Sequence, residues 1–398
     1  MKTTGHENPA QPRQHLGAYF DNNATTMVAP EVINKMVPLL ADQYGNPSSV
    51  HRLGRQAAEQ IAEAREKVAA LVGASAPSEI VFTGSGTEAD NLAITGILRL
   101  STTRKHLITT AVEHPAVLTV CQHLADQGVC ELTILPVDAV GQIDLRQLES
   151  ALRPETALVS IMLANNETGV VFDVLAAGEI VRRHGAIFHV DGVQAVGKLA
   201  VNLERLPVDL FSFSSHKLHG SKGVGALYVR KGTPLQGLIL GGQQERGRRA
   251  GTENVAAIAG FGVACEMAQD FLTQGMVKVG ALRDRLENSL LAAVPESVVN
   301  GEITSRVPTT SNMSFTGAEG EGILLMLDRH GVAVSSGAAC SSGSSAPSQV
   351  LLSMGLSEDL ARATVRFSLS RYSTEEEVDL ILQVLPDIIK NMRRGRPS

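Results

Sequence analysis

A lysine in this sequence comes shortly after a short apolar run. Lys217 lies in the stretch SFSSHKLHGSKGVGALYV, whose apolar run ends at Phe213. In open α/β sheets, ligands bind at the carboxyl ends of the strands. A lysine there, flanked by hydroxyl groups and small residues, can form a Schiff base with the aldehyde group of a cofactor. The alternative is a surface lysine that merely follows a strand.

A carboxylate occupies a similar place in the stretch FHVDGVQAVG. Asp191 stands two residues after His189, so both side chains belong to one strand face, and Gln194 follows just beyond. A carboxylate at the mouth of a parallel sheet can keep a heteroaromatic nitrogen protonated, as a cofactor that acts as an electron sink requires. An ordinary aspartate that caps the following helix is the alternative.

A glycine-rich turn precedes a predicted helix in the stretch FTGSGTEADN. Gly84, Gly86 and Thr87 open this helix, where free backbone N–H groups and the helix dipole favour a phosphate group. The Gly-Lys-Ser/Thr ending of a Walker A motif is absent. A glycine-rich turn without a ligand is the alternative.

Two further polar residues stand at the ends of predicted elements, His114 in AVEHPAV and Asn166 in LANNETG. An imidazole at the start of a helix can stack on a planar cofactor and transfer protons, although a solvated histidine is the alternative. Asn166 can donate a hydrogen bond to a substrate carboxylate or to a cofactor oxygen.

A single thiol, Cys340, lies in the loop VSSGAACSSGSS among small residues. A free cysteine in an exposed loop is a liability unless its reactivity is used. On the loop alone, an incidental cysteine in a Gly/Ser-rich turn is the alternative.

The composition indicates an ordinary globular protein of two domains. The chain has 398 residues, of which 43% are hydrophobic and 19% are charged, and its net charge is −6. An acidic chain gives no reason to expect nucleic acid as a partner. The arginine cluster in GGQQERGRRAGTEN (241–254) is therefore not interpreted as a nucleic-acid-binding patch. It can bind a phosphate group, form a solvated loop or contact another subunit.

The cysteines and the N-terminus predict a cytoplasmic protein. The four cysteines show no CxxC spacing, which argues against a zinc site and against a disulfide framework. The first residues do not form a signal peptide. No stretch approaches the roughly 18 uncharged apolar residues of a membrane-spanning helix, so no membrane partner is expected.

Short apolar runs alternate with helical patterns between about residues 50 and 270, which predicts an α/β fold with a mostly parallel sheet. A helix over QAAEQIAEAREKVAALV should end at Gly73, and further helices are expected over residues 86–98 and 115–125. The six strand-like runs are residues 79–83, 106–112, 157–163, 186–190, 209–213 and 225–229.

The character of the sequence changes near residues 274–278, after a predicted long helix. We expect a flexible tail over residues 1–17 and a large cofactor-binding domain over 18–275, whose first residues pack with the small domain. A smaller α+β domain over 276–398 would carry the Cys340 loop, 335–345. Its last helix should open with a capping box of Ser373 and Glu376, and Pro386 should kink or break it.

Each of these signals is weak alone, but the lysine, the carboxylate, the phosphate-ready helix start and the imidazole all fall at strand ends of one predicted sheet. Taken together, nine motifs of the chain resemble those of the NifS/IscS group of cysteine desulfurases. They are FDNNATT, YGNPSSVH, VEHPAV, ANNETG, VDGVQAVGK, SSHKLHGSKGVG, ERGRRAGTEN, SSGAACSSGS and TVRFSLSRY. The NifS-like branch fits best, and the resemblance extends over residues 18–390.

The resemblance implies a fold-type-I, class-V aminotransferase-related enzyme with a seven-stranded sheet and pyridoxal 5′-phosphate as its cofactor. Lys217 would be the Schiff-base lysine, Asp191 the partner of the pyridine nitrogen, Gln194 the partner of the phenolic oxygen, and His114 the stacking and catalytic imidazole. The remaining assignments are phosphate contacts by Gly86, Thr87, Ser214, His216 and a second subunit's Thr252, and substrate carboxylate contacts by Asn166 and Arg366.

The resemblance also implies a role for Cys340. It would accept sulfur from L-cysteine as a persulfide, with release of L-alanine, and pass the sulfur to an iron–sulfur scaffold or another acceptor. No metal site is expected, apart from a transient iron–sulfur fragment on Cys340. The assignment of Thr252 implies a homodimer with shared active sites.

Two positions depart from the family pattern. Ser215 stands where the family usually has Gly, and Ser221 where it usually has Pro. The alternatives are a selenocysteine lyase and another class-V aminotransferase or lyase. A non-catalytic sulfur carrier would use the Cys340 loop alone.

Overall fold

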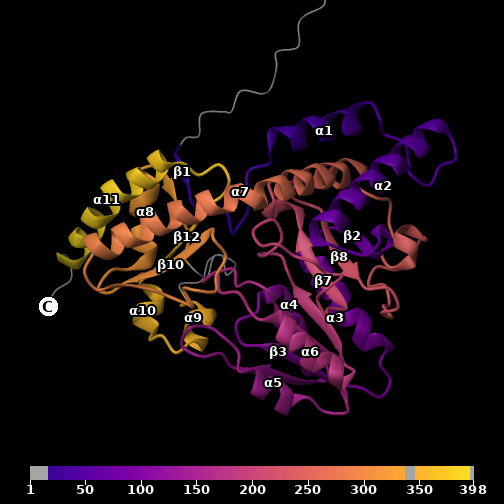
Figure 1. Cartoon of the computed structure of the whole chain (residues 1–398), viewed down its shortest axis with the longest axis horizontal. Helices are drawn as coiled ribbons and strands as arrows, with labels where there is room; N and C mark the ends of the chain where they lie inside the picture. Colours follow the sequence, from indigo (N-terminus) through magenta and orange to yellow (C-terminus); the bar gives the residue numbers. More distant parts are fainter. Residues whose placement is uncertain (1–16, 337–345, 395–398) are drawn as a thin grey trace, which may run out of the picture.

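The computed structural model describes residues 17–336 and 346–394 (Figure 1). Its largest sheet has seven strands in the spatial order β2-β8-β7-β6-β5-β3-β4. Strand β8 runs antiparallel to the other six strands of this sheet. The predicted α/β fold class with a mostly parallel seven-stranded sheet is thereby confirmed. In chain order the strands are β2 (Ile80–Thr83), β3 (His106–Thr110), β4 (Glu131–Leu135), β5 (Thr156–Met162), β6 (Ile187–Asp191), β7 (Leu210–Ser214) and β8 (Gly225–Val229).

Side chains on successive strand positions pack into two different cores, as the period of two along a strand requires. On β2, Ile80 and Phe82 join one hydrophobic cluster and Val81 joins another. The first cluster includes side chains from α1 (Pro30–Ala41), α2 (Arg52–Val72), α5 (Leu145–Ala151), α6 (Val174–His184) and α7 (Val255–Ala293). The second includes side chains from α3 (Gly86–Leu100) and α4 (Pro115–Asp126). The sheet is therefore covered on both faces.

The helix predicted to end at Gly73 does so. Gly73 caps α2 with a φ of 61°, in the left-handed region that glycine adopts without steric strain. The apolar residues Ile61, Ala64, Val68 and Leu71 of α2 share one helical face, which is buried. The helices expected over residues 86–98 and 115–125 are α3 and α4, each within two residues of the predicted ends.

A third hydrophobic cluster lies around a three-stranded antiparallel sheet of order β12-β10-β9. Its strands are β9 (Ser297–Val299), β10 (Thr310–Phe315) and β12 (Thr364–Ser368), and its helices are α8 (Gly320–Arg329) and α11 (Glu375–Arg394). Ala18 and Phe20, from the first described residues, belong to this cluster. The strand β1 (Ala18–Tyr19) pairs in parallel with β11 (Val332–Ala333). The short helices α9 (Gln349–Ser353) and α10 (Glu358–Arg362) lie at the lower edge of this part (Figure 1).

The helix α7 joins the two parts of the molecule. It runs without interruption for 39 residues and crosses residue 275, where the predicted domain boundary falls (Figure 1). Its first half packs against α1 and α2, whereas Val279, Leu286 and Leu290 belong to the third cluster, around the three-stranded sheet. Part of α7 is apolar and long enough to span a membrane by composition, but 56% of that window is buried inside the protein. We interpret α7 as a core helix.

The last helix differs from the prediction in its capping box and in the absence of a break at Pro386. The capping box at the start of α11 pairs Thr374 with Glu377, one residue later than the predicted Ser373 and Glu376. The helix also continues through Pro386 to Arg394. Its buried apolar face, which includes Leu385 and Ile388, explains why packing outweighs the lost backbone hydrogen bond.

Candidate active site

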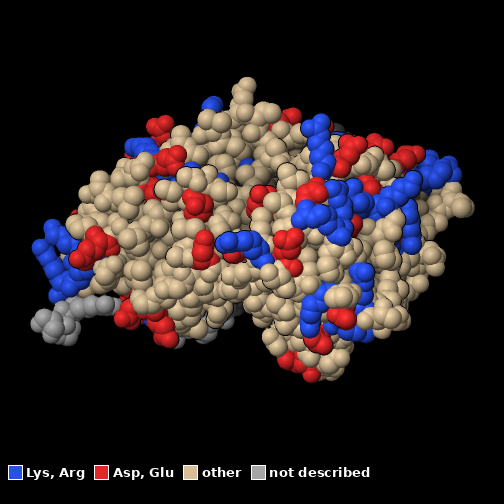
Figure 2. Space-filling view, turned by 60° about the horizontal axis from the view of Figure 1, so that its bottom comes forward, with Lys and Arg blue, Asp and Glu red and all other residues tan. Residues whose placement is uncertain are grey.

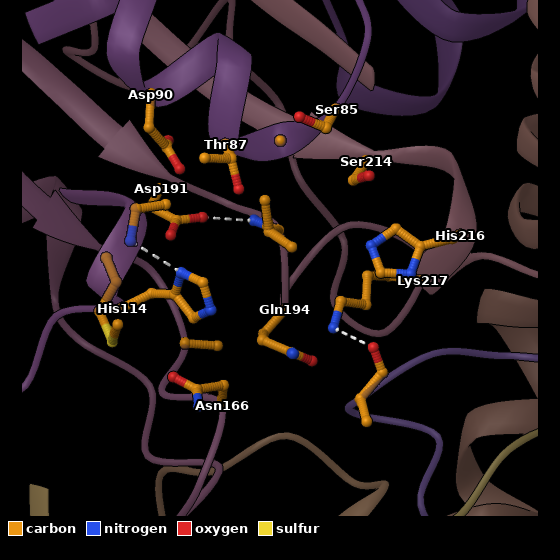
Figure 3. Close-up of a pocket in the computed structure, with 16 residues that line it drawn as sticks. Ser85, Thr87, Asp90, His114, Asn166, Asp191, Gln194, Ser214, His216 and Lys217 are labelled. Atoms are coloured by element: carbon orange, nitrogen blue, oxygen red, sulfur yellow. Dashed lines mark hydrogen bonds between the residues drawn. The ribbon is translucent and has the colours of Figure 1, made fainter. Parts of the chain in front are cut away.

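A pocket of about 220 Å³ lies at the carboxyl ends of the parallel strands. Strands β5, β6 and β7 end at its wall, at Met162, Asp191 and Ser214. Its lining includes nine of the predicted site residues: Gly86, Thr87, His114, Asn166, Asp191, Gln194, Ser214, His216 and Lys217. Figure 3 shows these side chains converging from separate segments of the chain. The structure therefore brings most of the predicted site together.

One end of the pocket has the features of a phosphate cradle. The helix α3 begins at Gly86, and the preceding Ser85 accepts a hydrogen bond from the N–H of Glu88. A Cβ atom on Gly86 would lie 2.8 Å from Val193 Cγ2, so only glycine lets this turn pack so closely. Ser214 Oγ is buried and has no hydrogen-bond partner in the described residues. A helix start with an unsatisfied hydroxyl beside it suits an anion.

The opposite end of the pocket is acidic and buried. Asp191 is 5% exposed and accepts a hydrogen bond of 2.9 Å from the N–H of Val193. Burial raises the pKa of Asp191 to about 6, although the Val193 bond and the positive charge of Lys217 oppose this shift. Two further buried carboxyl groups, Asp90 and Glu113, lie nearby, and burial raises the pKa of Glu113 to about 8. Asp191 is thus placed to meet a protonated heterocyclic nitrogen.

His114 is the N-cap residue of α4. Its Nδ1 accepts a hydrogen bond of 3.1 Å from the N–H of Ala116, which orients the ring (Figure 3). Burial, and then the charge of Lys217, lowers the pKa of His114 to about 4. The imidazole is therefore neutral at physiological pH, and because its Nδ1 accepts the Ala116 bond, its proton lies on Nε2.

Lys217 follows β7 in the short 3-10 turn Ser215–Lys217. Its Nζ donates hydrogen bonds to the backbone oxygens of Asn23 and Ala24, the latter at 2.9 Å. His216 contacts the same segment, because its Nδ1 lies 3.2 Å from Thr25 Oγ1. The segment 20–26 therefore forms one wall of the site.

Arg366 lies behind Asn166 and does not line the pocket. It is 1% exposed on β12 and donates from Nη1 to the backbone oxygen of Asn166 at 3.0 Å and from Nη2 to Asp21 Oδ1 at 2.7 Å. Arg366 Nε and Asn166 Oδ1 are buried without a partner among the described residues. Ser335, the first residue of the predicted Cys340 loop, pairs with Arg366 through backbone hydrogen bonds. The start of that loop is thus held beside the predicted carboxylate site.

Besides Arg366, two predicted site residues do not line this pocket. Thr252 lines a different cavity of about 180 Å³, with Arg249 and Glu245. Cys340 lies outside the described residues.

Residues that the sequence analysis did not assign also belong to the site. Ser85 and Asp90 line the pocket. Asn23 contacts Lys217, Gln194 and Lys198. The FDNNATT stretch was a recognisable motif, but nothing in its residue types pointed to a position 194 residues away in the chain.

The residues present fit pyridoxal phosphate. The unsatisfied Ser214 hydroxyl at a helix start suits its phosphate, and the buried Asp191 carboxyl suits its ring nitrogen. The amine of Lys217 lies in the same pocket, where it can bind the aldehyde.

Comparisons with known proteins agree with this site. The family model described as aminotransferase class V matches residues 18–381. A cysteine desulfurase of Trichormus azollae is 51% identical over 379 residues, which cover 95% of this chain and 94% of the relative. The cysteine desulfurase NifS of Azotobacter vinelandii is 48% identical over the same shares of both chains. A solved structure described as a NifS-like protein superposes with a TM-score of 0.88 at 38% identity, covering 94% of this chain and all of that one.

Such identity along nearly the whole chain, together with the geometry of the pocket, places this protein in the class-V aminotransferase family, among the NifS-like cysteine desulfurases, which use pyridoxal phosphate.

Proposed function

We propose that this protein removes sulfur from L-cysteine, forms L-alanine and holds the sulfur as a persulfide on Cys340. The observation that carries this proposal is the convergence of Lys217, Asp191, His114 and the Ser214 hydroxyl on one pocket, in a chain of this family. Figure 3 shows these four residues around one pocket.

The family resemblance and the lining of the pocket support one set of cofactor contacts. Lys217 would bind the aldehyde carbon, Asp191 the ring nitrogen and Gln194 the phenolic oxygen, while the neutral His114 ring would lie against the cofactor ring. Gly86, Thr87, Ser214 and His216 would hold the phosphate group. When bound, pyridoxal phosphate withdraws electrons from the α-carbon of the substrate.

The protein's own groups would then move protons and bind the carboxylate. Lys217 takes the proton from the substrate's Cα, and His114, whose neutral ring carries its proton on Nε2, assists the return of the proton beside it. Asn166 and Arg366 bind the α-carboxylate in this proposal, and Arg366 Nε is a buried donor without a hydrogen-bond partner among the described residues.

Cys340 is the nucleophile in this proposal. The three described cysteines, Cys121, Cys130 and Cys265, are buried, and burial raises the pKa of each thiol, so none is a ready thiolate. The Cys340 thiolate attacks the substrate sulfur and forms an S–S bond. The Cβ–S bond breaks, its electron pair and a proton go to Cβ, and alanine leaves without any external oxidant.

The test is direct. The purified protein is given pyridoxal phosphate and its visible spectrum is recorded; L-cysteine is then added under reductant, and sulfide and alanine are measured together. We expect a yellow protein that forms both in equal amounts, and a colourless Lys217→Ala variant that forms neither. A keto acid instead of alanine would indicate an aminotransferase, and turnover with selenocysteine alone would indicate a selenocysteine lyase. A wild-type protein that binds no cofactor would refute the proposal.

We further propose a homodimer in the cytoplasm, in which Thr252 completes the partner's phosphate site. Support comes from Thr252, which is exposed and away from this chain's own pocket. Large apolar side chains are also exposed on this single chain, among them Val37, Leu40, Tyr44, Val50 and Leu240. On the face drawn in Figure 2, basic side chains gather at the right-hand end with acidic ones among them. The sulfur would pass to an iron–sulfur scaffold or another acceptor protein.

Mixed dimers test the role of Thr252. One subunit carries Lys217→Ala and the other Thr252→Ala. If Thr252 acts across the interface, the one remaining lysine site is complete, and its cofactor affinity equals that of the wild type. If Thr252 acts within its own chain, that site binds the cofactor about tenfold more weakly, as loss of one charge-assisted hydrogen bond predicts. Sedimentation velocity shows whether the dimer exists.

A further inference from the structure

Lys198 is a buried lysine beside the pocket with no role in the proposed chemistry. It is 7% exposed and lies in the segment after β6. Its Nζ donates hydrogen bonds to Gln194 Oε1 at 2.6 Å and to Asn23 Oδ1 at 2.8 Å. Both of these acceptors are neutral amide oxygens. Keeping an ammonium group buried with such partners is costly, so its position calls for a physical explanation.

An ammonium group can only donate hydrogen bonds, whereas an amide end has a donor and an acceptor side. Lys198 therefore determines which way round two amides lie. It holds Gln194 Oε1 toward itself, so Gln194 Nε2 points away from Lys198. This nitrogen donates one of its two protons to the backbone oxygen of Asn23 at 2.9 Å. One Nε2 proton remains for a ligand in the pocket that Gln194 lines (Figure 3).

Asn23 is oriented in the same way. Because Lys198 binds its Oδ1, Asn23 Nδ2 donates to the backbone oxygen of Asn166 at 3.1 Å and to Thr310 Oγ1 at 2.9 Å. The backbone oxygen of Asn23 also accepts a hydrogen bond from Lys217. The Lys198 ammonium group thus determines which atoms of the Gln194 and Asn23 amides donate hydrogen bonds and which accept them.

The charge of Lys198 acts on the same site. Burial first, and then the charges of Lys217 and Arg366, lower its pKa well below the usual lysine value, whereas the two amide oxygens that accept from Nζ favour its charged form. Lys198 in turn lowers the pKa values of His216 and His219, among other causes. A region with several cationic groups stabilises a ligand oxygen that carries negative charge.

We propose that Lys198 is a positioning residue that holds the Gln194 amide with its N–H side toward the pocket, so that the pocket selects a hydrogen-bond-accepting, anionic oxygen on the cofactor. This inference rests on the proposed function, because the oxygen concerned is the phenolic oxygen of pyridoxal phosphate. It adds a residue outside the pocket lining whose effect passes through Gln194.

The test is a pH titration of the visible absorption band of the cofactor-loaded protein. A hydrogen bond and a positive charge near the phenolic oxygen both favour the deprotonated form of the bound cofactor. Lys198→Met removes the charge and lets the Gln194 amide turn, so the titration midpoint should rise by about one pH unit, the equivalent of one lost hydrogen bond. Lys278→Met, which removes an exposed lysine on α7, is the matched control and should leave the midpoint unchanged.

A double-mutant cycle shows whether the effect passes through Gln194. In a Gln194→Ala background, Lys198→Met should shift the midpoint much less than it does in the wild type. A full shift in that background would show that Lys198 acts without Gln194, and no shift in either background would show that it does not act at all. Either result would overturn the inference.

Folding and cofactor binding are followed separately. Thermal melting of the cofactor-free protein shows whether Lys198→Met folds. If it does not fold, Lys198→Gln takes its place. A glutamine side chain both donates and accepts hydrogen bonds, so it does not force the Gln194 amide into one orientation. Lys198→Arg keeps a donor-only cation and should restore the wild-type midpoint; an Arg variant that behaves like Met would contradict the inference. A wild-type protein without an absorption band would instead contradict the proposed function.

Discussion

Lys217 Nζ lies 2.9 Å from the backbone oxygen of Ala24, although 193 residues separate the two in the chain. The neighbouring residues reinforce this contact, because Thr26 Oγ1 donates to the backbone oxygen of His216 and Ala29 N donates to that of His219. The N-terminal segment thus closes the site around the reactive lysine. A strand-end lysine becomes a positioned amine only when this segment is packed against it.

Replacing Cys340 separates cofactor binding from sulfur transfer. Cys340→Ala should keep the wild-type visible spectrum and lose sulfide and alanine formation, because no described cysteine offers an exposed thiol. The measurement is the spectrum together with product formation from L-cysteine under reductant. Cys130→Ala, at a buried cysteine outside the pocket, serves as the control and should retain turnover. Full turnover by the Cys340 variant would show that the nucleophile is another group.

A buried ion pair supports the loop before α7. Arg65 donates from Nη1 and Nη2 to both carboxylate oxygens of Glu245 at 2.7 Å, and Glu245 also accepts from the N–H of Phe82. Arg65→Met leaves the Glu245 charge buried and unpaired, so unfolding free energy should fall by about 3–5 kcal/mol in urea titrations.

The exposed pair of Arg183 and Glu149 provides the comparison for Arg65. These side chains are more than 60% exposed and lie 3.5 Å apart. Arg183→Met should therefore cost less than about 1 kcal/mol. Equal losses of unfolding free energy in the two variants would mean that burial does not increase the contribution of the Arg65–Glu245 pair to stability.

His189 should make the protein's stability fall in acid. It is fully buried between Ser160 and Ser212, which lie 2.8 and 2.9 Å from its ring nitrogens. Burial lowers the pKa of His189 to about 3 in the folded state, below its ordinary 6.5. Its contribution is therefore present above pH 6.5 and is lost as the pH falls toward the folded value, since only the unfolded chain takes up the proton.

A comparison with His189→Gln isolates this contribution. Between pH 7 and 5 the wild type should lose about 2 kcal/mol more unfolding free energy than the variant. Urea titrations of the cofactor-free proteins at each pH measure the difference. A constant difference for His189→Gln would mean that His189 gains its proton without unfolding.

The serine at the first departure from the family pattern should be dispensable. Ser215 is fully buried, and its hydroxyl has no partner among the described residues. Ser215→Ala should raise the unfolding free energy by about 1 kcal/mol, because an unsatisfied buried hydroxyl is removed. Ser160→Ala, which breaks a hydrogen bond to His189, should lower it by a similar amount. A loss of stability in the Ser215 variant would indicate that its hydroxyl is bonded after all.

The strands of the large sheet were predictable because most are continuous apolar runs. The exception is β4, which the pattern missed. It lies at the edge of the sheet beside β3, and Glu131 and Ile134 are exposed, so it lacks the apolar run of a strand covered on both faces. The full length of α7 was missed for a similar reason, because its two halves pack against different cores.

The sequence by itself determined the chemical groups of the site. Lys217, Asp191, His114 and the Gly86 turn stand at element ends, and a parallel sheet brings such ends to one edge. Tertiary structure alone decided how these groups are held. The contacts of Asn23 with Lys217 and Lys198, and of Arg366 with Asn166, join segments whose separation in the chain leaves no local pattern. Hydrogen bonds of this kind depend on distances between packed elements, which residue type and spacing do not encode.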